Sequence, residues 1–176
     1  MEEQVILVDE EGGEVGVMEK MAAHQVAALH RAFSVFIFNS QGQLLLQRRA
    51  DHKYHSGGLW TNTCCSHPRP GEGVDEAARR RLQEEMGLDC DLQEVFVFTY
   101  QARLDHDLSE HEYDHVLLGR CDADPSPNPD EVSAWKWVDP DELEQDRKLN
   151  PDRYTAWFHL AFPRLLSWLE EHGCFS

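Results

Sequence analysis

Residues 66–88 read SHPRPGEGVDEAARRRLQEEMGL, and this stretch decides the fold expected for the chain. It predicts a helix over Val74–Met86, because apolar residues recur at helical spacing and charged residues fill the other positions. The residues that share the apolar face are Ala77, Ala78, Leu82 and Met86. Gly87 suits the C-terminal cap, since glycine readily adopts the left-handed conformation that ends many helices.

The segments on either side of this helix predict a mixed β-sheet with further helices. Short apolar runs bounded by turn residues indicate strands at Val5–Val8, Ala32–Asn39, Gln43–Gln47, Leu92–Tyr100, Tyr113–Cys121 and Ser133–Val138. Helix-like composition marks Glu19–Leu29, Pro140–Arg147 and Phe162–His172. Ser40-Gln41-Gly42 separates the second and third runs, which predicts a β-hairpin. The expected fold class is α/β (α+β), in one domain over residues 1–176, because no repeat or long linker divides the chain.

Charge and hydropathy exclude several functional classes. The chain has 33 acidic and 16 basic residues, a formal net charge of −17, which opposes nucleic-acid binding because that requires a basic surface. No apolar run approaches the ~20 residues that span a bilayer, and the N-terminus lacks the pattern of a signal peptide. We therefore expect a cytoplasmic monomer without a nucleic-acid or membrane partner. The acidity fits either a high-salt cytoplasm or an ordinary protein with acidic segments.

The cysteines predict reduced thiols. They are odd in number and lack the spacing of a disulfide framework: Cys64, Cys65, Cys90, Cys121 and Cys174. Cys65 lies two positions before His67, and a thiol near a metal or a cation can have a lowered pKa and act as acid, base or nucleophile. The alternative is a small buried hydrophobic residue, which is the interpretation preferred for Cys64.

A set of imidazoles and carboxylates is suited to a divalent ion. Its members are His24, His30, His67, Glu110 and Glu112. If Glu110-His111-Glu112 is extended, the two carboxylates point to the same side, because side chains alternate along a strand. Such donors suit Zn²⁺, Mn²⁺ or Fe²⁺. The alternative is ordinary hydrogen-bonded or solvated histidines, and with ten His in the chain spacing alone does not select these three.

Basic residues concentrate before residue 82, although bases are scarce overall. The candidates among them are Lys20, Arg48, Arg49, Lys53, Arg79, Arg80 and Arg81. This density suggests a multiply charged anion as ligand. The alternative is i,i+4 pairing within the helix, for which Arg80–Glu84 and Arg81–Glu85 are candidates. The acidic pair Glu84-Glu85 offers a carboxylate to Mg²⁺ bound to phosphate oxygens, or it is only a solvated face.

Taken together, these motifs resemble the type I isopentenyl diphosphate isomerases, a branch of the Nudix superfamily. The Nudix box, G-x5-E-x7-R-E-U-x-E-E-x-G-U with U a bulky aliphatic residue, falls on Ser66, Glu72, Arg80, Arg81, Leu82, Glu84, Glu85, Gly87 and Leu88. Ser66 replaces the first Gly, and Arg81 replaces the first Glu of the R-E pair, which the isomerase branch is expected to show. Trp60–Pro68 matches the catalytic-cysteine motif of this branch, with Ser66 again in place of the usual Gly. Glu110–Glu112 matches its E-x-E motif, and Gln47–Ala50 matches its R-R-A segment. Met21–His24 and Leu29–Phe33 match its two histidine segments.

The resemblance implies a Nudix-type mixed sheet sandwiched by helices and a role for each matching residue. His24, His30, His67, Glu110 and Glu112 would bind one divalent metal (Mn²⁺, Zn²⁺ or Mg²⁺), and Glu85 would hold Mg²⁺ against the substrate's diphosphate. Lys20, Arg49, Lys53 and Arg81 would contact that diphosphate. Cys65 and Glu112 would act on the isoprenoid tail, and Tyr100 would assist Glu112. Trp157 would face the carbocation that forms on that tail. Ordinary core packing is the alternative for Trp157.

Two other functions compete with isomerisation of an isoprenoid diphosphate. A Nudix hydrolase of nucleoside diphosphate derivatives would depend on an intact acidic box, and that box here has Arg81 in place of a carboxylate. A metal-stabilised binding module would use the His and Glu residues structurally. Neither explains Cys65, Arg81 and the Glu110/Glu112 pair together.

Overall fold

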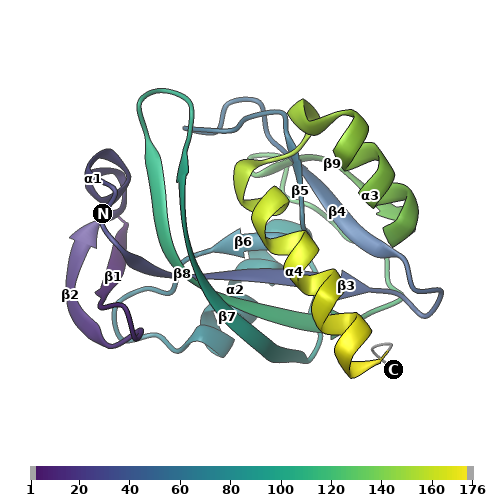
Figure 1. Ribbon diagram of the computed structural model, residues 1–176, viewed down its shortest axis with the longest axis horizontal. Coiled ribbons are helices and arrows are strands. Elements are labelled where there is room, and N and C mark those ends of the chain that lie inside the picture. The colour runs from purple at the N-terminus through teal and green to yellow at the C-terminus, as the bar shows by residue number, and fades with distance from the viewer. Residues whose placement is uncertain (1–2, 174–176) are drawn as a thin grey trace.

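A computed structural model describes residues 3–173 and shows a mixed sheet with helices on both faces (Figure 1). The strands are β1 (Gln4–Val8), β2 (Glu14–Glu19), β3 (His30–Phe38), β4 (Leu44–Arg49), β5 (Trp60–Thr61), β6 (Cys64–Ser66), β7 (Leu92–Arg103), β8 (Ser109–Arg120) and β9 (Val132–Val138). The helices are α1 (Lys20–Val26), α2 (Val74–Met86), α3 (Pro140–Leu149) and α4 (Ala156–His172), and a 3₁₀ turn, Pro151–Arg153, precedes α4. The sheet is mixed because β3 runs parallel to β8 and antiparallel to its other partners.

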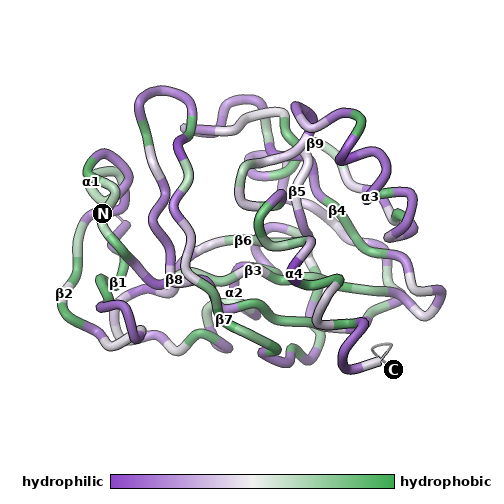
Figure 2. The backbone as a smooth tube through the Cα atoms, in the orientation of Figure 1, coloured by the Kyte–Doolittle hydropathy of each residue, from purple (hydrophilic) through white to green (hydrophobic). Residues whose placement is uncertain are grey.

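Strand β3 divides the hydrophobic core into two halves. Successive side chains of a strand point to opposite faces, so Phe33, Val35 and Ile37 pack with α2, whereas Phe36 and Phe38 pack with α4. Figure 2 shows the hydrophobic residues along the central strands and hydrophilic residues along the β7–β8 hairpin where it leaves the sheet. The predicted α/β class, with a sheet sandwiched by helices, is confirmed.

Helix α2 has the predicted limits. It runs from Val74 to Met86, its four predicted apolar residues are completely buried, and Gly87 ends it with φ 64°. A Cβ at residue 87 would lie 2.6 Å from the Ser126 carbonyl oxygen, so glycine is required both by the backbone angle and by this close approach.

Most of the other predicted limits differ from the observed ones by one or two residues, and three segments differ more. Helix α1 ends at Val26 rather than Leu29, because Ala27 adopts the left-handed conformation with φ 54°. Helix α4 begins at Ala156 rather than Phe162, since the Thr155 hydroxyl caps it by accepting a hydrogen bond from the Phe158 amide. The region between Tyr100 and Tyr113 is mostly strand rather than loop, and Ala102 pairs with Glu110.

The predicted hairpin of β3 and β4 exists only next to its turn. Phe38 and Leu44 form the single paired position between the two strands. Beyond it the strands separate, because β4 pairs with β9 while β3 pairs with β6 and β8. This separation makes room in the sheet for the short strand β6, which carries Cys65.

The four cysteines within residues 3–173 are free thiols: Cys64, Cys65, Cys90 and Cys121. Cys174 lies outside the described residues. Across the same range, no helix combines the length and the apolar character needed to cross a membrane.

Candidate active site

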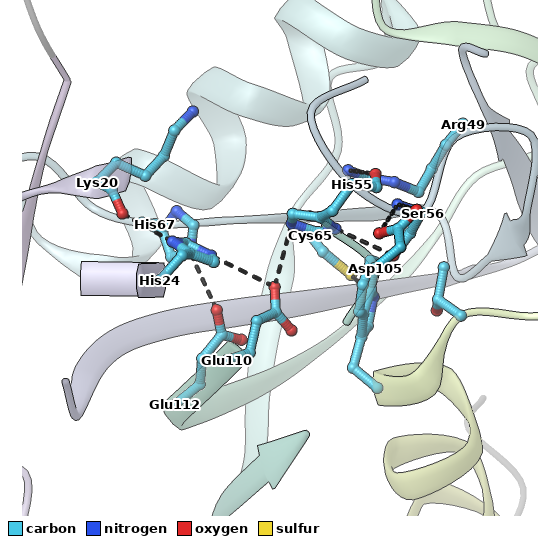
Figure 3. Close-up of polar contacts among 12 residues, drawn as sticks. Lys20, His24, Arg49, His55, Ser56, Cys65, His67, Asp105, Glu110 and Glu112 are labelled. Atoms are coloured by element: carbon cyan, nitrogen blue, oxygen red, sulfur yellow. Dashed lines mark hydrogen bonds and ion pairs between the residues drawn. The ribbon is translucent and has the colours of Figure 1, made fainter. Parts of the chain in front are cut away.

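One polar pocket gathers most of the residues that the sequence singled out. It is lined by Glu3, Lys20, Arg49, Lys53, Tyr54, His55, Cys65, Ser66, His67, Arg81, Glu85, Tyr100, Glu110, Glu112, Glu131 and Trp157. These residues come from α1, α2 and α4, from strands β4, β6, β7 and β8, from connecting loops and from the segment before β1. Figure 3 shows the side chains of His24 and His67 beside the carboxylates of Glu110 and Glu112.

Strand register brings the imidazoles to the carboxylates. Glu110 and Glu112 lie on one face of β8 because the segment is extended, as the alternating pattern predicted. His30 is opposite Glu112 in the parallel pairing of β3 with β8, and its Nε2 lies 3.2 Å from Glu112 Oε2. His67 follows β6, and its Nε2 lies 3.0 Å from the same oxygen. His24, from α1, places its Nε2 3.7 Å from Glu110 Oε1.

The pKa values of the two carboxylates are shifted in opposite directions because their partners differ. Burial acts to raise the pKa of Glu112, but hydrogen bonds with His30 and His67 outweigh it and hold that pKa well below the ordinary range. Burial, together with the charge of Glu112, raises the pKa of Glu110. Burial lowers the pKa of His67 to about 4, so this imidazole is neutral near pH 7 and has a lone pair available for a metal.

These donors fit a divalent ion. The nitrogen and oxygen atoms of His24, His30, His67 and Glu112 lie within 4.8 Å of one another. Nε2 of His24 is buried and has no hydrogen-bond partner in the described part of the chain, which is unusual for a buried polar atom. Its Nδ1 is held 2.8 Å from the Lys20 carbonyl oxygen, so Nε2 is left to face the cluster, as in metal-binding histidines.

Cys65 and Tyr100 face the same pocket. The Cys65 Sγ lies 2.9 Å from Asn62 Oδ1 and 3.2 Å from the Trp157 indole nitrogen. Burial, with the charge of Asp114, raises the pKa of Cys65, which is opposite to the lowered pKa that its neighbours suggested. A cation bound nearby opposes this shift by stabilising the thiolate. The Tyr100 hydroxyl lies 2.5 Å from Glu112 Oε1.

The basic residues divide into two groups. Four of them line the pocket: Lys20, Arg49, Lys53 and Arg81. The others pair elsewhere, since Arg80 bonds to Glu72 and Glu84, Arg79 to Asp89, and Arg48 to the Gly58 carbonyl oxygen. The predicted i,i+4 pairs are both present, with nitrogen–oxygen distances of 2.9 Å for Arg80–Glu84 and 3.0 Å for Arg81–Glu85. Arg81 therefore lines the pocket, as predicted for an anion-binding residue, and also forms the predicted i,i+4 pair with Glu85.

Glu85 and Trp157 complete the predicted set. Glu85 is 4% exposed, and its carboxylate is contacted by Arg81, by the Gln47 amide at 3.1 Å and by the Cys64 thiol at 3.4 Å. Trp157 is 3% exposed, so it is packed as well as pocket-lining, and its ring centre lies 5.1 Å from the Arg49 guanidinium carbon. The pocket thus combines four cationic side chains with a His/Glu cluster that could hold a metal, and Cys65 and Trp157 contact each other within it.

Similarity to known proteins identifies the family. The NUDIX domain family matches residues 28–158. Isopentenyl-diphosphate Delta-isomerase 2 of Aromatoleum aromaticum is 56% identical over 167 residues, which cover 95% of this chain and 88% of the relative. The isopentenyl-diphosphate Delta-isomerase of Pectobacterium atrosepticum is 55% identical, over 92% of this chain and 90% of the relative. The chain belongs to the isopentenyl-diphosphate Delta-isomerase family. The family resemblance drawn from the motifs is confirmed.

Solved structures support the same fold. A Deinococcus radiodurans protein, DR0079, superposes with a TM-score of 0.78 at 22% identity, over 92% of this chain and 98% of the other. At that identity the likeness concerns only the fold, which is the Nudix fold with a mixed sheet between helices.

Several pocket residues were not singled out by sequence reasoning. They are Glu3, Tyr54, His55 and Glu131, and Ser66 was noted only as a departure from the motif. Glu131 lies 2.6 Å from the Lys53 ammonium and 3.4 Å from Arg81, and Glu3 lies 2.6 Å from Lys20. No periodicity marks these residues, because they lie in the N-terminal segment and in loops. One sequence signal was available for His55, which is that it directly follows Lys53-Tyr54. The structure shows that His55 is buried in its loop.

Proposed function

We propose that this protein interconverts isopentenyl diphosphate and dimethylallyl diphosphate by adding one proton to the isoprenoid tail and removing another. The observation that carries the proposal is one pocket that is lined by Cys65, the Glu112–Tyr100 pair and four cationic side chains. The His/Glu cluster that could hold a metal belongs to the same site. The names of the relatives support the same substrate class.

The cationic end of the pocket suits the diphosphate. Lys20, Arg49, Lys53 and Arg81 would bind its oxygens, since guanidinium and ammonium groups form charge-assisted hydrogen bonds with phosphate. Three of these cations are paired with Glu3, Glu85 or Glu131 in the substrate-free protein. A diphosphate therefore enters by exchanging those carboxylates for its own oxygens. Glu85 would hold Mg²⁺ against the diphosphate, which lowers the repulsion between the two anions.

The reacting end suits proton transfer to and from carbon. Moving the double bond by one position requires a proton at one end of the allyl unit and loss of a proton from C2. Glu112, hydrogen-bonded to Tyr100, and Cys65 would be the two groups, and they exchange roles when the reaction runs in reverse. The tertiary cation formed on the way needs a stabilising surface that does not react with it, and the indole face of Trp157 provides one.

The His/Glu cluster fits a resident divalent ion. His24, His30, His67, Glu110 and Glu112 would hold it, and candidates are Mn²⁺, Zn²⁺ and Mg²⁺. When bound, the ion supplies positive charge that fixes the Glu112 carboxylate and neutralises the buried acids. Tyr100 then keeps Glu112 oriented toward the tail through its hydroxyl. We further propose that the protein acts as a monomer in the cytoplasm, with no macromolecular partner in the reaction.

Incubation with isopentenyl diphosphate, Mg²⁺ and Mn²⁺, followed by acid treatment, tests the proposal. The allylic product is acid-labile and the reactant is not, so isomerisation appears as acid-labile material that increases with enzyme concentration. Release of phosphate or a nucleotide monophosphate from nucleoside diphosphate derivatives, without isomerisation, would instead support a hydrolase. Metal-dependent folding with neither activity would support a binding module.

A further inference from the structure

His55 is a buried imidazole outside the predicted ligand set. It lies in the connection between β4 and β5, is 2% exposed, and its ring centre lies 5.6 Å from those of both His24 and Trp157. Its Nε2 is 3.7 Å from Glu110 Oε1. Dashed lines in Figure 3 lead from the Glu110 carboxylate to His24 and to His55.

His55 and His24 are each held at Nδ1 by a neighbouring residue, and in the proposed site the Ser56 hydroxyl accepts from Nδ1 of His55 as the Lys20 carbonyl accepts from Nδ1 of His24. The distances from Nδ1 are 3.0 Å to the Ser56 hydroxyl for His55 and 2.8 Å to the Lys20 carbonyl oxygen for His24. The Ser56 amide in turn donates to the Asp105 carboxylate at 3.0 Å, which anchors the loop. An imidazole that ligates a metal shows this arrangement, with one nitrogen oriented by a neighbour and the other free for the ion.

The free nitrogens of both rings face Glu110. Within residues 3–173, Nε2 of His24 and Nε2 of His55 are buried without a hydrogen-bond partner, and each lies 3.7 Å from the same carboxylate oxygen. That separation is too long for a hydrogen bond. Two donors about 2.1 Å from one ion are roughly 3.0–3.4 Å apart at octahedral or tetrahedral angles. The observed separations therefore correspond to donors on a shared ion more closely than to hydrogen-bonded partners.

We propose that His55 Nε2 ligates the same divalent ion as His24, so that this ion has six protein donors. The proposal rests on the metal site of the proposed function. His24, His55 and Glu110 form one donor group, and His24 also belongs to the group with His30, His67 and Glu112. Since Nδ1 of His24 is engaged and Nε2 has one lone pair, His24 can bind only one ion. His24 therefore cannot serve one ion in each group, and the proposal assigns both groups to a single ion.

Four imidazoles and two carboxylates define the chemistry of this ion. The two acids neutralise one divalent charge but not two, which also favours a single ion. Imidazole donors favour Mn²⁺, Fe²⁺, Co²⁺ or Zn²⁺ over Mg²⁺. A sphere filled by protein leaves no position for the substrate, so the site serves to hold Glu110 and Glu112 in place.

The test uses the full-length protein, stripped of metal and titrated with Co²⁺ against a competing chelator. We expect one Co²⁺ per chain in the wild type. His55→Gln should weaken Co²⁺ binding by at least ~100-fold, the upper end of the loss caused by removing a residue that only orients a ligand. The visible Co²⁺ absorption should also intensify, since five-coordinate Co²⁺ absorbs more strongly than six-coordinate Co²⁺. His52→Gln, at an exposed position in the same loop, should change neither.

A second variant covers the case in which His55→Gln folds poorly without metal. His55→Cys places a thiolate donor at the same position, and a sulfur-to-cobalt charge-transfer band, absent from the wild type, should appear if residue 55 reaches the ion. An unchanged affinity and spectrum in His55→Gln, a weaker affinity with an unchanged spectrum, or two Co²⁺ per chain would each overturn the proposal. If the wild type bound no ion, the result would instead contradict the metal site of the proposed function.

Discussion

At the scale of single residues, two adjacent cysteines have opposite environments. Cys64 is completely buried in the core beneath α2, and its thiol contacts Glu85. Cys65 points the other way, because side chains alternate along β6, and it lines the pocket beside Trp157. Substituting each thiol in turn therefore distinguishes a catalytic role, expected for Cys65, from a packing role, expected for Cys64.

We expect Cys65→Ala to lower the isomerisation kcat by at least ~10²–10⁴-fold, since one general acid–base group is lost. The thermal midpoint should change little, because Cys65 lines the pocket and does not belong to either half of the hydrophobic core. Cys64→Ala is the matched control and should retain kcat within several-fold. Acid-labile product formation and circular dichroism measure the two effects. Near-wild-type turnover in Cys65→Ala would remove Cys65 from the proposed pair.

At the scale of elements, the loop before α2 is fastened to the helix by one ion pair. Arg80 donates to both carboxylate oxygens of Glu72, at 2.7 Å and 2.9 Å. This bond from Arg80 lowers the pKa of Glu72 against a small opposing effect of burial. The Nudix-box spacing between Glu72 and Arg80 thus has a structural use here, which is to hold the loop that leads from His67 into the helix.

The Glu72–Arg80 pair should stabilise the fold in a pH-dependent manner. The pKa of Glu72 is lower in the folded than in the unfolded chain. The ion pair therefore contributes to the free energy of unfolding at pH values above the ordinary Glu pKa of about 4.3, and this contribution is lost as the pH falls through the folded-state pKa. Glu72→Gln should lower the thermal midpoint by roughly 1–4 °C at pH 7. Below the folded pKa the variant and the wild type should melt alike.

Thermal melts of both proteins from pH 7 down to acid measure this difference. Glu10→Gln, which removes an exposed carboxylate in the β1–β2 turn, is the control for the loss of one negative charge from an acidic protein. A deficit in Glu72→Gln that persists unchanged at low pH would show that the residue acts through packing instead.

At the scale of the whole molecule, the His/Glu cluster joins segments that are distant in sequence. His24 comes from α1, His30 from β3, His67 from the loop after β6, and the two acids from β8. A divalent ion bound there connects the N-terminal helix to the centre of the sheet. Because the unfolded chain lacks this arrangement, binding should stabilise the native state.

Removing the ion should therefore destabilise the protein. At a metal concentration 100-fold above the Kd, binding contributes about 2.7 kcal/mol, so excess chelator should lower the thermal midpoint by roughly 5–10 °C. Resupplying Mn²⁺ should restore the midpoint, and Mg²⁺ should restore less, since imidazole donors favour the transition ion. Differential scanning calorimetry measures both steps. A midpoint that is the same with and without chelator would argue against a resident ion.

Local patterns in the sequence predicted the elements that depend on near neighbours. The helix Val74–Met86, its glycine cap and the shared face of Glu110 and Glu112 follow from helical and strand periodicity, which the chain carries by itself. The limits of α1 and α4 did not follow, because they depend on the left-handed conformation of Ala27 and on the Thr155 cap.

The sequence by itself determined the fold class and the family and selected the candidate catalytic side chains, because periodicity and ordered motifs encode them. Only the tertiary structure decided which side chains meet. The parallel pairing of β3 with β8 brings His30 to Glu112, and the β4–β5 loop brings His55 to Glu110. Such contacts join residues tens of positions apart, and their distances depend on strand register and loop closure, which no local pattern of residues specifies.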